Sequence, residues 1–512
     1  MPKSARRPVR LLLAILLAGT FALPARAQGA PEGDLVILHT NDIHGGFLAE
    51  KQEGREGEPA RHVGGFRALD TWLRAHRKDY PASLLLDAGD LMTGNPICET
   101  QRDGIYGVDL VEMMNLVGYD ATVIGNHDLD DGLSNLEGLI KVFRFPVLAA
   151  NLTRIDGSLV APEPYHLYPV GPFKVGVIGL VWDGYAKVVG AATMAKLQVA
   201  SAAETAKRWI AELDPKTDVI ILLTHQGLDH DRELAQHLGP EVDLIVGGHS
   251  HAALSQPVMA NGIPIVQAGC SLNLLGKVTL HVKDDKAVSV RGELIRLEET
   301  GEPGPEMQAL VTANETRVME KFGEVIGVLE NGWSRNYYGE SSLGNFVTDC
   351  LREKYGADFA VMNSGSLRKN LPAGDIRRID LYEIYPFANP VVRFEITGAE
   401  LLTILHRNAW SAVTRDHGIL QVSGVRYTWA RKGDADGKIL EATVAGEPIV
   451  PEKIYRGVSG NFVAADKAEK YLGLRLTRWQ DTADTVRGVL EEAIRAKKTV
   501  TGRIEGRIQG PN

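Results

Sequence analysis

The sequence predicts a layered α/β protein with two domains. Strand-like apolar runs alternate with amphipathic segments in the first half, and polar residues directly follow several of those runs. A second α/β pattern begins after a segment rich in Gly, Pro and Glu at 298–305. With 512 residues, the chain is long enough for two or three domains.

The first half contains short runs typical of strands and longer segments typical of helices, and their alternation predicts stacked layers of sheet and helix. The predicted strands are 35–39, 83–87, 121–125, 174–181, 218–224, 244–247 and 264–268. The predicted helices are 65–77, 108–117, 201–212 and 231–237.

The pattern predicts a first α/β domain over 28–300 and a linker with a connecting helix over 301–324. A second, smaller α/β domain is expected over 325–508. Its predicted elements are a helix at 343–355 and strands near 359–362 and 391–396.

Residues 1–27 have the features of an export signal. Basic residues precede the apolar run 11–23, and Ala25-Arg26-Ala27 supplies small residues at cleavage spacing, so the mature chain is expected to begin near Gln28. The run is shorter than the roughly 20 residues that span a bilayer, although an uncleaved anchor is the alternative. We therefore expect a periplasmic or secreted protein with no stable membrane span after cleavage. The basic residues are Lys3, Arg6, Arg7 and Arg10.

Net charge and cysteine content exclude some partners and cross-links. The chain has 56 Lys and Arg against 65 Asp and Glu, a formal net charge of -9, so no global basic field attracts a nucleic acid polymer. Cys98, Cys270 and Cys350 are too few for a disulfide framework. Buried thiols are favoured, and a Cys98–Cys270 pair is the alternative. The oligomeric state is not predicted.

The polar residues after the strands have the chemistry of metal ligands. Asp42 and His44, two positions apart in an extended loop, present a carboxylate and an imidazole to the same side. Asp90 follows an apolar run and a glycine, while Asp87 lies inside that run and is expected to be structural. Because the carboxyl ends of strands collect ligands in open sheets, these loops are expected to converge.

Gly125-Asn126-His127-Asp128 follows another strand. An Asn amide oxygen is an uncommon metal ligand, and His127 is expected to face the substrate. Asp130 is predicted to orient His127 and favour its protonated form, with Asp128 as the competing candidate.

Three further histidines complete the set: His225 after a strand, and His249 and His251 in a loop that begins with glycine. Mixed nitrogen and oxygen ligands suit Mn, Fe, Co or Zn. Each histidine alone is weak evidence, but the ordered set indicates a metal site.

These motifs together resemble the binuclear metallophosphoesterase family. The resemblance implies a four-layer α/β/β/α sandwich and two divalent metal ions, with Asp90 bridging them and His127, oriented by Asp130, stabilising charge on the phosphoryl and leaving-group oxygens. One ion would be held by Asp42, His44, Asp90 and His251, and the other by Asp90, Asn126, His225 and His249.

The second half resembles the C-terminal domain of the 5'-nucleotidase family, on the segments 343–345, 363–368, 420–424 and 461–462. In that family the second domain binds the nucleoside and rotates toward the metals, so the linker is expected to act as a hinge. The resemblance implies that Asn363 and Arg368 face the substrate and that Phe462 stacks on a base.

The second half also departs from the family pattern. Ile419 stands where many relatives have an aromatic residue, and Gly339 stands where an arginine is often found. The segment after Phe462 is altered, so no role is transferred to Asp466. Tyr427 or Trp429 is a candidate replacement for the missing ring.

The sequence therefore predicts an exported two-metal hydrolase of small-molecule phosphate esters, with nucleoside 5'-monophosphates as the favoured substrates. A UDP-sugar or 2',3'-cyclic nucleotide phosphodiesterase is the alternative. A thiosulfohydrolase-like enzyme and a non-catalytic nucleotide-binding protein rank lower.

Overall fold

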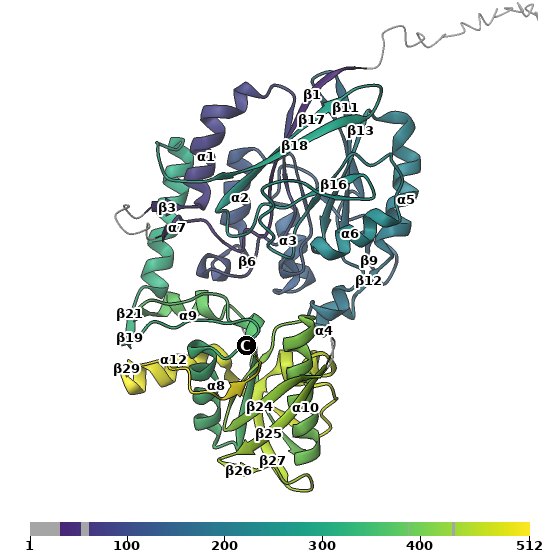
Figure 1. Ribbon diagram of the computed structural model, residues 1–512. Helices are drawn as coiled ribbons and strands as arrows, with labels where there is room; N and C mark the ends of the chain where they lie inside the picture. The colour runs from purple at the N-terminus through teal and green to yellow at the C-terminus, as the bar shows by residue number, and fades with distance from the viewer. Residues whose placement is uncertain (1–30, 53–60, 388, 433–435, 512) are drawn as a thin grey trace, which may run out of the picture.

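The chain forms two lobes joined by a long helix in a computed structural model (Figure 1). The structure describes residues 31–52, 61–387, 389–432 and 436–511. The predicted export signal lies outside the described residues. Within the described parts, no helix combines the length and apolar character needed to cross a membrane.

The first lobe contains two six-stranded sheets. The order of the first is β18-β17-β1-β4-β7-β8, and that of the second is β10-β11-β13-β14-β16-β15. The first sheet consists of β1 Gly33–Thr40, β4 Ser83–Asp87, β7 Ala121–Val123, β8 Val147–Leu148, β17 Leu274–Val282 and β18 Ala287–Arg296. The second consists of β10 Tyr165–Val170, β11 Phe173–Val181, β13 Val219–His225, β14 Leu244–Gly247, β15 Val258–Ala260 and β16 Ile263–Val266.

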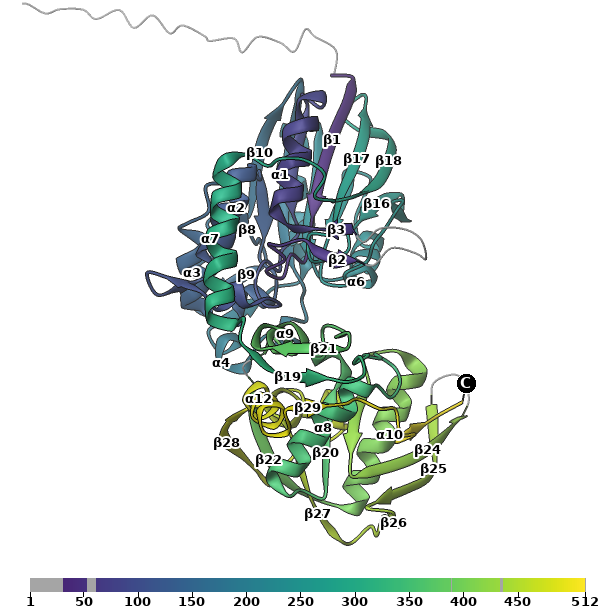
Figure 2. The same cartoon turned by 90° about the vertical axis from the view of Figure 1, so that its left-hand side faces the viewer.

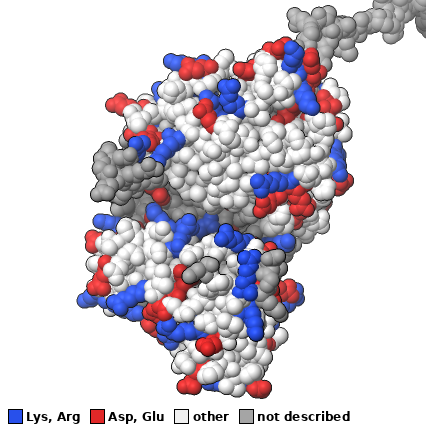
Figure 3. All heavy atoms as spheres, viewed as in Figure 1, with Lys and Arg blue, Asp and Glu red and all other residues white. Residues whose placement is uncertain are grey.

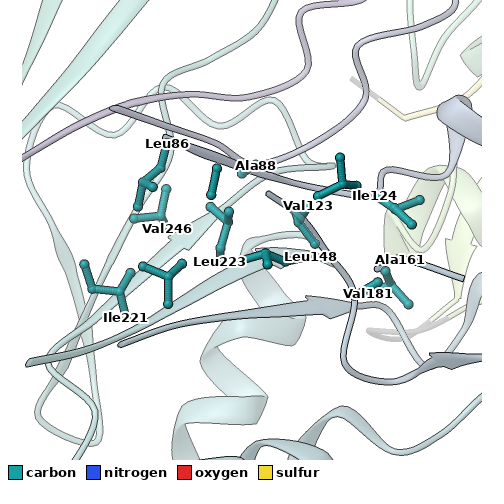
Figure 4. Close-up of a cluster of buried hydrophobic side chains, with 14 of the residues drawn as sticks. Leu86, Ala88, Val123, Ile124, Leu148, Ala161, Val181, Ile221, Leu223 and Val246 are labelled. Carbon is teal, nitrogen blue, oxygen red and sulfur yellow. The ribbon is translucent and has the colours of Figure 1, made fainter. Parts of the chain in front are cut away.

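The two sheets pack face to face through an apolar core (Figure 4). Leu86 and Val123 come from the first sheet, and Ile221, Leu223 and Val246 from the second. Successive strand residues point to opposite faces, so a second apolar set on each sheet packs against helices. These helices are α1 Gly65–His76 and α2 Val108–Val117 on the first sheet, and α5 Ala202–Leu213 and α6 Leu228–Gln236 on the second. The four-layer α/β/β/α sandwich is thereby confirmed.

Most predicted elements lie within three residues of their expected bounds. The strand predicted at 121–125 ends at Val123, so Gly125 lies in the loop after it, where a Cβ would collide with Asp90 Oδ1. Helix α6 begins at Leu228, three residues before the predicted start, because Gly227 with φ +91° precedes it.

The connecting helix α7 Pro305–Phe322 packs against the first lobe. Its buried residues Met307, Val311, Val318 and Phe322 belong to the same apolar cluster as α1 and α2. Figure 2 shows α7 along one side of the first lobe, running down to the second. A change in lobe orientation would therefore require movement of the chain after Phe322.

The second lobe is also α/β. Its main sheet has the order β23-β20-β27-β22-β28, and a four-stranded sheet and a three-stranded sheet flank it. The strands of the main sheet are β20 Phe359–Asn363, β22 Pro390–Thr397, β23 Leu420–Ser423, β27 Ile454–Gly460 and β28 Trp479–Thr485. The lobe also contains β19 Val325–Leu329, α8 Ser342–Tyr355, α9 Arg378–Ile384 and β24 Val425–Lys432.

All three cysteines are free. Cys98 and Cys350 are buried, as expected for structural thiols, while Cys270 is partly exposed. The alternative Cys98–Cys270 disulfide is not formed.

Candidate functional site

A cleft of about 1660 Å³ lies between the lobes and is lined by residues of both. Strands β4 and β14 belong to parallel pairs in the two sheets, and Asp90 after β4 and His249 after β14 line the cleft from the first lobe. The second lobe contributes Arg335, Arg368, Lys369, Arg377 and Lys470 to the opposite wall. Figure 3 shows Lys and Arg side chains along the edge of the lower lobe that faces the upper lobe. Asp375, Asp380, Glu383, Asp416 and Asp466 line the same wall, so its charge is mixed. Lys369 is paired with Glu50 and Glu383, whereas Arg335 and Arg368 are available to an anionic ligand.

Asp42, His44 and His251 form one cluster, in which one donor atom from each lies within 4.8 Å of the others. His251 Nε2 lies 3.3 Å from Asp42 Oδ1 and 3.1 Å from His44 Nε2. Two imidazole nitrogens thus lie near one carboxylate oxygen, and these three atoms could together bind a cation.

Asp90, His225 and His249 form the second cluster. His225 Nε2 lies 3.1 Å from Asp90 Oδ2, although the pair lacks the geometry of a hydrogen bond. The other neighbour of Asp90 Oδ2 is His44 Nε2 of the first cluster, 3.8 Å away. Asp90 therefore lies between the two clusters.

Asn126 completes the predicted set, and its side-chain oxygen Oδ1 is buried without a hydrogen-bond partner among the described residues. A buried amide oxygen left unpaired costs free energy unless another group binds it. The orphaned oxygen is the kind of donor that a cation would satisfy.

Five of the seven predicted ligands have left-handed backbone conformations, which cost roughly 1–3 kcal/mol each for residues other than glycine. Hydrogen bonds between the loops stabilise these conformations: Asp42 N donates to Gly89 O at 2.8 Å, and His44 N donates to Asp90 O at 3.0 Å. The φ values are 52° for Asp42, 50° for His44, 60° for Asp90, 76° for His249 and 55° for His251. Ten other non-glycine residues of the described chain also have positive φ, so these conformations support a functional site only together with the clustering of the side chains.

Backbone carbonyls fix the orientation of two imidazoles. His44 Nδ1 lies 2.7 Å from Thr93 O, and His225 Nδ1 lies 2.6 Å from Ala88 O. When Nδ1 carries the proton, the lone pair of Nε2 is free to bind a cation in the cluster. Burial lowers the pKa of His44 and of His249 to about 3, so both imidazoles are neutral at pH 7. Burial also lowers the pKa of His225 and His251, but Asp90 and Asp42 outweigh it and raise these pKa values to about 10 and about 9, so binding of a cation would release those protons.

His127 lies beside the clusters. Its Nδ1 is 2.7 Å from Asp130 Oδ2, and its backbone N–H donates to Asp90 Oδ1 at 2.7 Å. Burial lowers the pKa of His127, but the neighbouring carboxylates of Asp130 and Asp90 outweigh burial, and the pKa is raised overall. The imidazole therefore retains a proton more readily than a free histidine.

Asp128, the competing partner for His127, is occupied elsewhere. Its carboxylate accepts the backbone N–H groups of Gly125 at 2.8 Å and Leu91 at 3.0 Å. Asp87 is similarly occupied by the hydroxyls of Thr40 at 2.7 Å and Thr122 at 3.0 Å. Both carboxylates brace the loops that carry the clusters.

The second lobe brings Asn363, Arg368 and Phe462 to the cleft. Phe387 connects the two walls, since its ring centroid is 5.9 Å from that of His127 and 5.9 Å from the Arg368 guanidinium carbon. The two halves of the predicted site thus meet, although its residues are up to 420 positions apart.

The sequence-based prediction missed Arg335, Tyr337 and Phe387, which also line the cleft. Among the described residues, no ion pair engages Arg335 or Arg368. Arg335 lies four positions before Gly339, so a search of the whole loop for arginine would have found it. Tyr427 and Trp429 lie on β24 in the core of the second lobe, outside the cleft lining.

Comparisons with known proteins fit this geometry. Residues 35–253 match the family model described as calcineurin-like phosphoesterase, and residues 325–472 match the one described as 5'-nucleotidase, C-terminal domain. The chain is 30% identical to Protein UshA of Escherichia coli (strain K12), over 88% of this chain and 90% of the relative. It is also 30% identical to a 5'-nucleotidase of Vibrio cholerae, over 88% of each.

Among solved structures, a 5'-nucleotidase precursor from Thermus thermophilus superposes with a TM-score of 0.82. The sequence identity is 26%, and the match covers 94% of this chain and all of the other. The similarity thus extends over both lobes.

Proposed function

The chain belongs to the family of UshA proteins and 5'-nucleotidases and is a metal-dependent phosphoester hydrolase; from this premise we propose that it is exported and hydrolyses nucleoside 5'-monophosphates. One observation carries the proposal. The cleft has two clusters of possible metal ligands on the first lobe, and arginine and aromatic side chains face them from the second lobe.

The donors present fit two divalent cations. The buried oxygen of Asn126 has no partner among the described residues, and Asp90 lies between the two clusters. Asp42, His44, Asp90 and His251 would hold one ion, and Asp90, Asn126, His225 and His249 the other. When bound, such ions supply positive charge to phosphate oxygens and acidify water.

The protein's own residues account for the other parts of the proposed reaction. Asp130 holds His127 through Nδ1, which directs Nε2 away from that carboxylate. A protonated His127 would donate to the developing charge on the phosphoryl or leaving-group oxygen. Arg368 would bind the phosphate from the second lobe, and Asn363 the nucleoside portion.

A substrate panel tests the proposal. The purified mature chain, loaded with Mn, Co, Zn or Fe in turn, is assayed with AMP, UDP-glucose, ATP, 2',3'-cyclic nucleotides and aryl phosphates. We expect the highest kcat/KM for AMP. A preference for UDP-glucose or a cyclic nucleotide would support the phosphodiesterase alternative, and no turnover of any ester would refute phosphoester hydrolysis in favour of thiosulfohydrolase chemistry or nucleotide binding alone.

The predicted export is tested separately. Expression of the full chain in a bacterial host, followed by fractionation and N-terminal sequencing, should yield a periplasmic or secreted product that begins near Gln28. An intact N-terminus in the membrane fraction would support the uncleaved anchor.

A further inference from the structure

Ile419, which stands where many relatives have an aromatic residue, is too buried to contact a ligand. Ile419 is 1% exposed and packs in the second lobe. Its N–H donates to Tyr337 O at 3.0 Å, and its carbonyl accepts the Ser364 N–H at 2.8 Å. Phe462 would therefore stack alone unless another segment supplies a ring.

Tyr337 is such a ring. It lies in the loop between β19 and α8, 47% of its surface is exposed, and it lines the cleft. The backbone is fixed because its carbonyl accepts both the Ile419 N–H and the Ser364 hydroxyl, the latter at 2.8 Å. A large aromatic side chain on a fixed backbone, open to the cleft, is preorganised to contact a ligand.

Two glycines make room for this ring. A Cβ at Gly418 would lie 2.9 Å from Tyr337 Cζ, and one at Gly365 would lie 3.4 Å from Cε2. The Tyr337 ring thus rests on a backbone without side chains, and its exposed surface remains available to the cleft.

Tyr337 belongs to the same end of the cleft as Phe462. The segment 417–418 and Tyr471 connect them. The Tyr337 ring packs on Gly418, the adjacent His417 has its ring centroid 4.9 Å from that of Tyr471, and the Tyr471 centroid is 5.9 Å from that of Phe462. Arg368 Nη1 donates to the carbonyl of Gly365, which lies against the Tyr337 ring, at 3.5 Å, and Phe387 lies between Arg368 and His127. The aromatic end of the cleft is therefore continuous with the predicted phosphate end.

We propose that Tyr337 is a specificity-determining residue that stacks on the nucleobase and, with Phe462, replaces the ring absent at Ile419. This rests on the proposed function, since it assigns the base-binding part of the same cleft. Flat rings suit this role because every base presents a π-face, and such contacts tolerate different bases. Tyr337 then favours binding of substrates that carry a base over those that lack one.

The test compares AMP with ribose 5-phosphate, which lacks the base, on the metal-loaded full chain. Tyr337→Ala should raise KM for AMP on the order of ten-fold, from the usual contribution of base stacking, and leave KM for ribose 5-phosphate unchanged. Tyr337→Phe keeps the ring and should retain the wild-type KM for both. Equal effects of Tyr337→Ala on both substrates, or no effect on AMP, would overturn the proposal.

Two further measurements separate this proposal from the proposed function. Trp479→Ala, on β28 outside the cleft lining, removes an aromatic side chain of similar exposure, 45%, and should leave both KM values unchanged. Adenosine binding, measured by calorimetry, needs no turnover and should weaken in Tyr337→Ala. If wild type binds adenosine but hydrolyses no ester, the proposed function fails while the stacking role stands; adenosine binding unaffected by Tyr337→Ala overturns the stacking role.

Discussion

The two walls of the cleft are built differently. In the first lobe the predicted ligands immediately follow strands, and Asp42 and Asp90 are almost fully buried in left-handed backbone conformations. In the second lobe Arg368 is partly exposed, and Tyr337 is nearly half exposed on a loop. The buried side chains of the first wall are thus suited to binding metal ions, whereas the exposed side chains of the second wall are suited to contacting the substrate.

This difference implies that loss of a predicted metal ligand in the first wall should abolish turnover of every substrate. Changes in the second wall should alter KM or the choice among substrates. Substitutions in each wall can distinguish these two outcomes.

The largest effect is expected for Asp90→Asn, because Asp90 lies between both donor clusters and also accepts the His127 N–H. Activity should fall at least on the order of 10³-fold on every substrate, and metal content, measured by mass spectrometry, should fall with it. Asp131→Asn, a carboxylate elsewhere in the cleft lining, is the matched control and should retain both. Wild-type metal content and turnover in Asp90→Asn would contradict the bridging role.

His127→Asn should reduce kcat by about 10²–10³-fold while leaving metal content intact, since general acid catalysis contributes on that order. Asp130→Asn should have a smaller effect in the same direction because it removes only the partner of Nδ1. Steady-state kinetics gives kcat for each variant, and metal analysis in parallel shows whether metal has been lost. Unchanged turnover in His127→Asn would remove it from the mechanism.

Arg368→Ala should raise KM roughly ten- to 100-fold for AMP and ribose 5-phosphate alike, because a hydrogen bond to a charged group contributes about 1.5–3 kcal/mol. Arg368→Lys should restore only part of the affinity, since lysine lacks the planar fork of donors. An effect confined to AMP would place Arg368 at the base instead of the phosphate.

The smallest effect is expected at a contact between the lobes. Lys467 is 8% exposed, its ammonium donates to Ala186 O at 2.5 Å in the first lobe, and burial lowers its pKa. Lys467→Met should change kcat and KM together by about two- to ten-fold, the net contribution of a hydrogen bond, and should broaden the distribution of lobe orientations in small-angle scattering. Lys438→Met, at an exposed position of the second lobe, is the control. Identical scattering and kinetics in Lys467→Met would show that this contact does not restrain the lobes.

The sequence alone predicted the layered fold and the group of polar residues after strands, because both depend on local patterns. Alternating apolar residues specify strands and helices, and a polar residue after a buried strand lies at the sheet edge. The choice of Asp130 over Asp128 was also predictable from spacing, and the structure supplies the reason: the Asp128 carboxylate is occupied by backbone N–H groups.

The aromatic residues of the second wall could be identified only from the tertiary structure. Tyr337 and Phe462 are far apart in the chain, and nothing local to either indicates that both line one cleft. The sequence showed that a ring was absent at Ile419, but its candidate replacements, Tyr427 and Trp429, are on a strand that packs in the core. Which exposed ring reaches the cleft is determined by the packing of loops from different elements, which no single segment of sequence encodes.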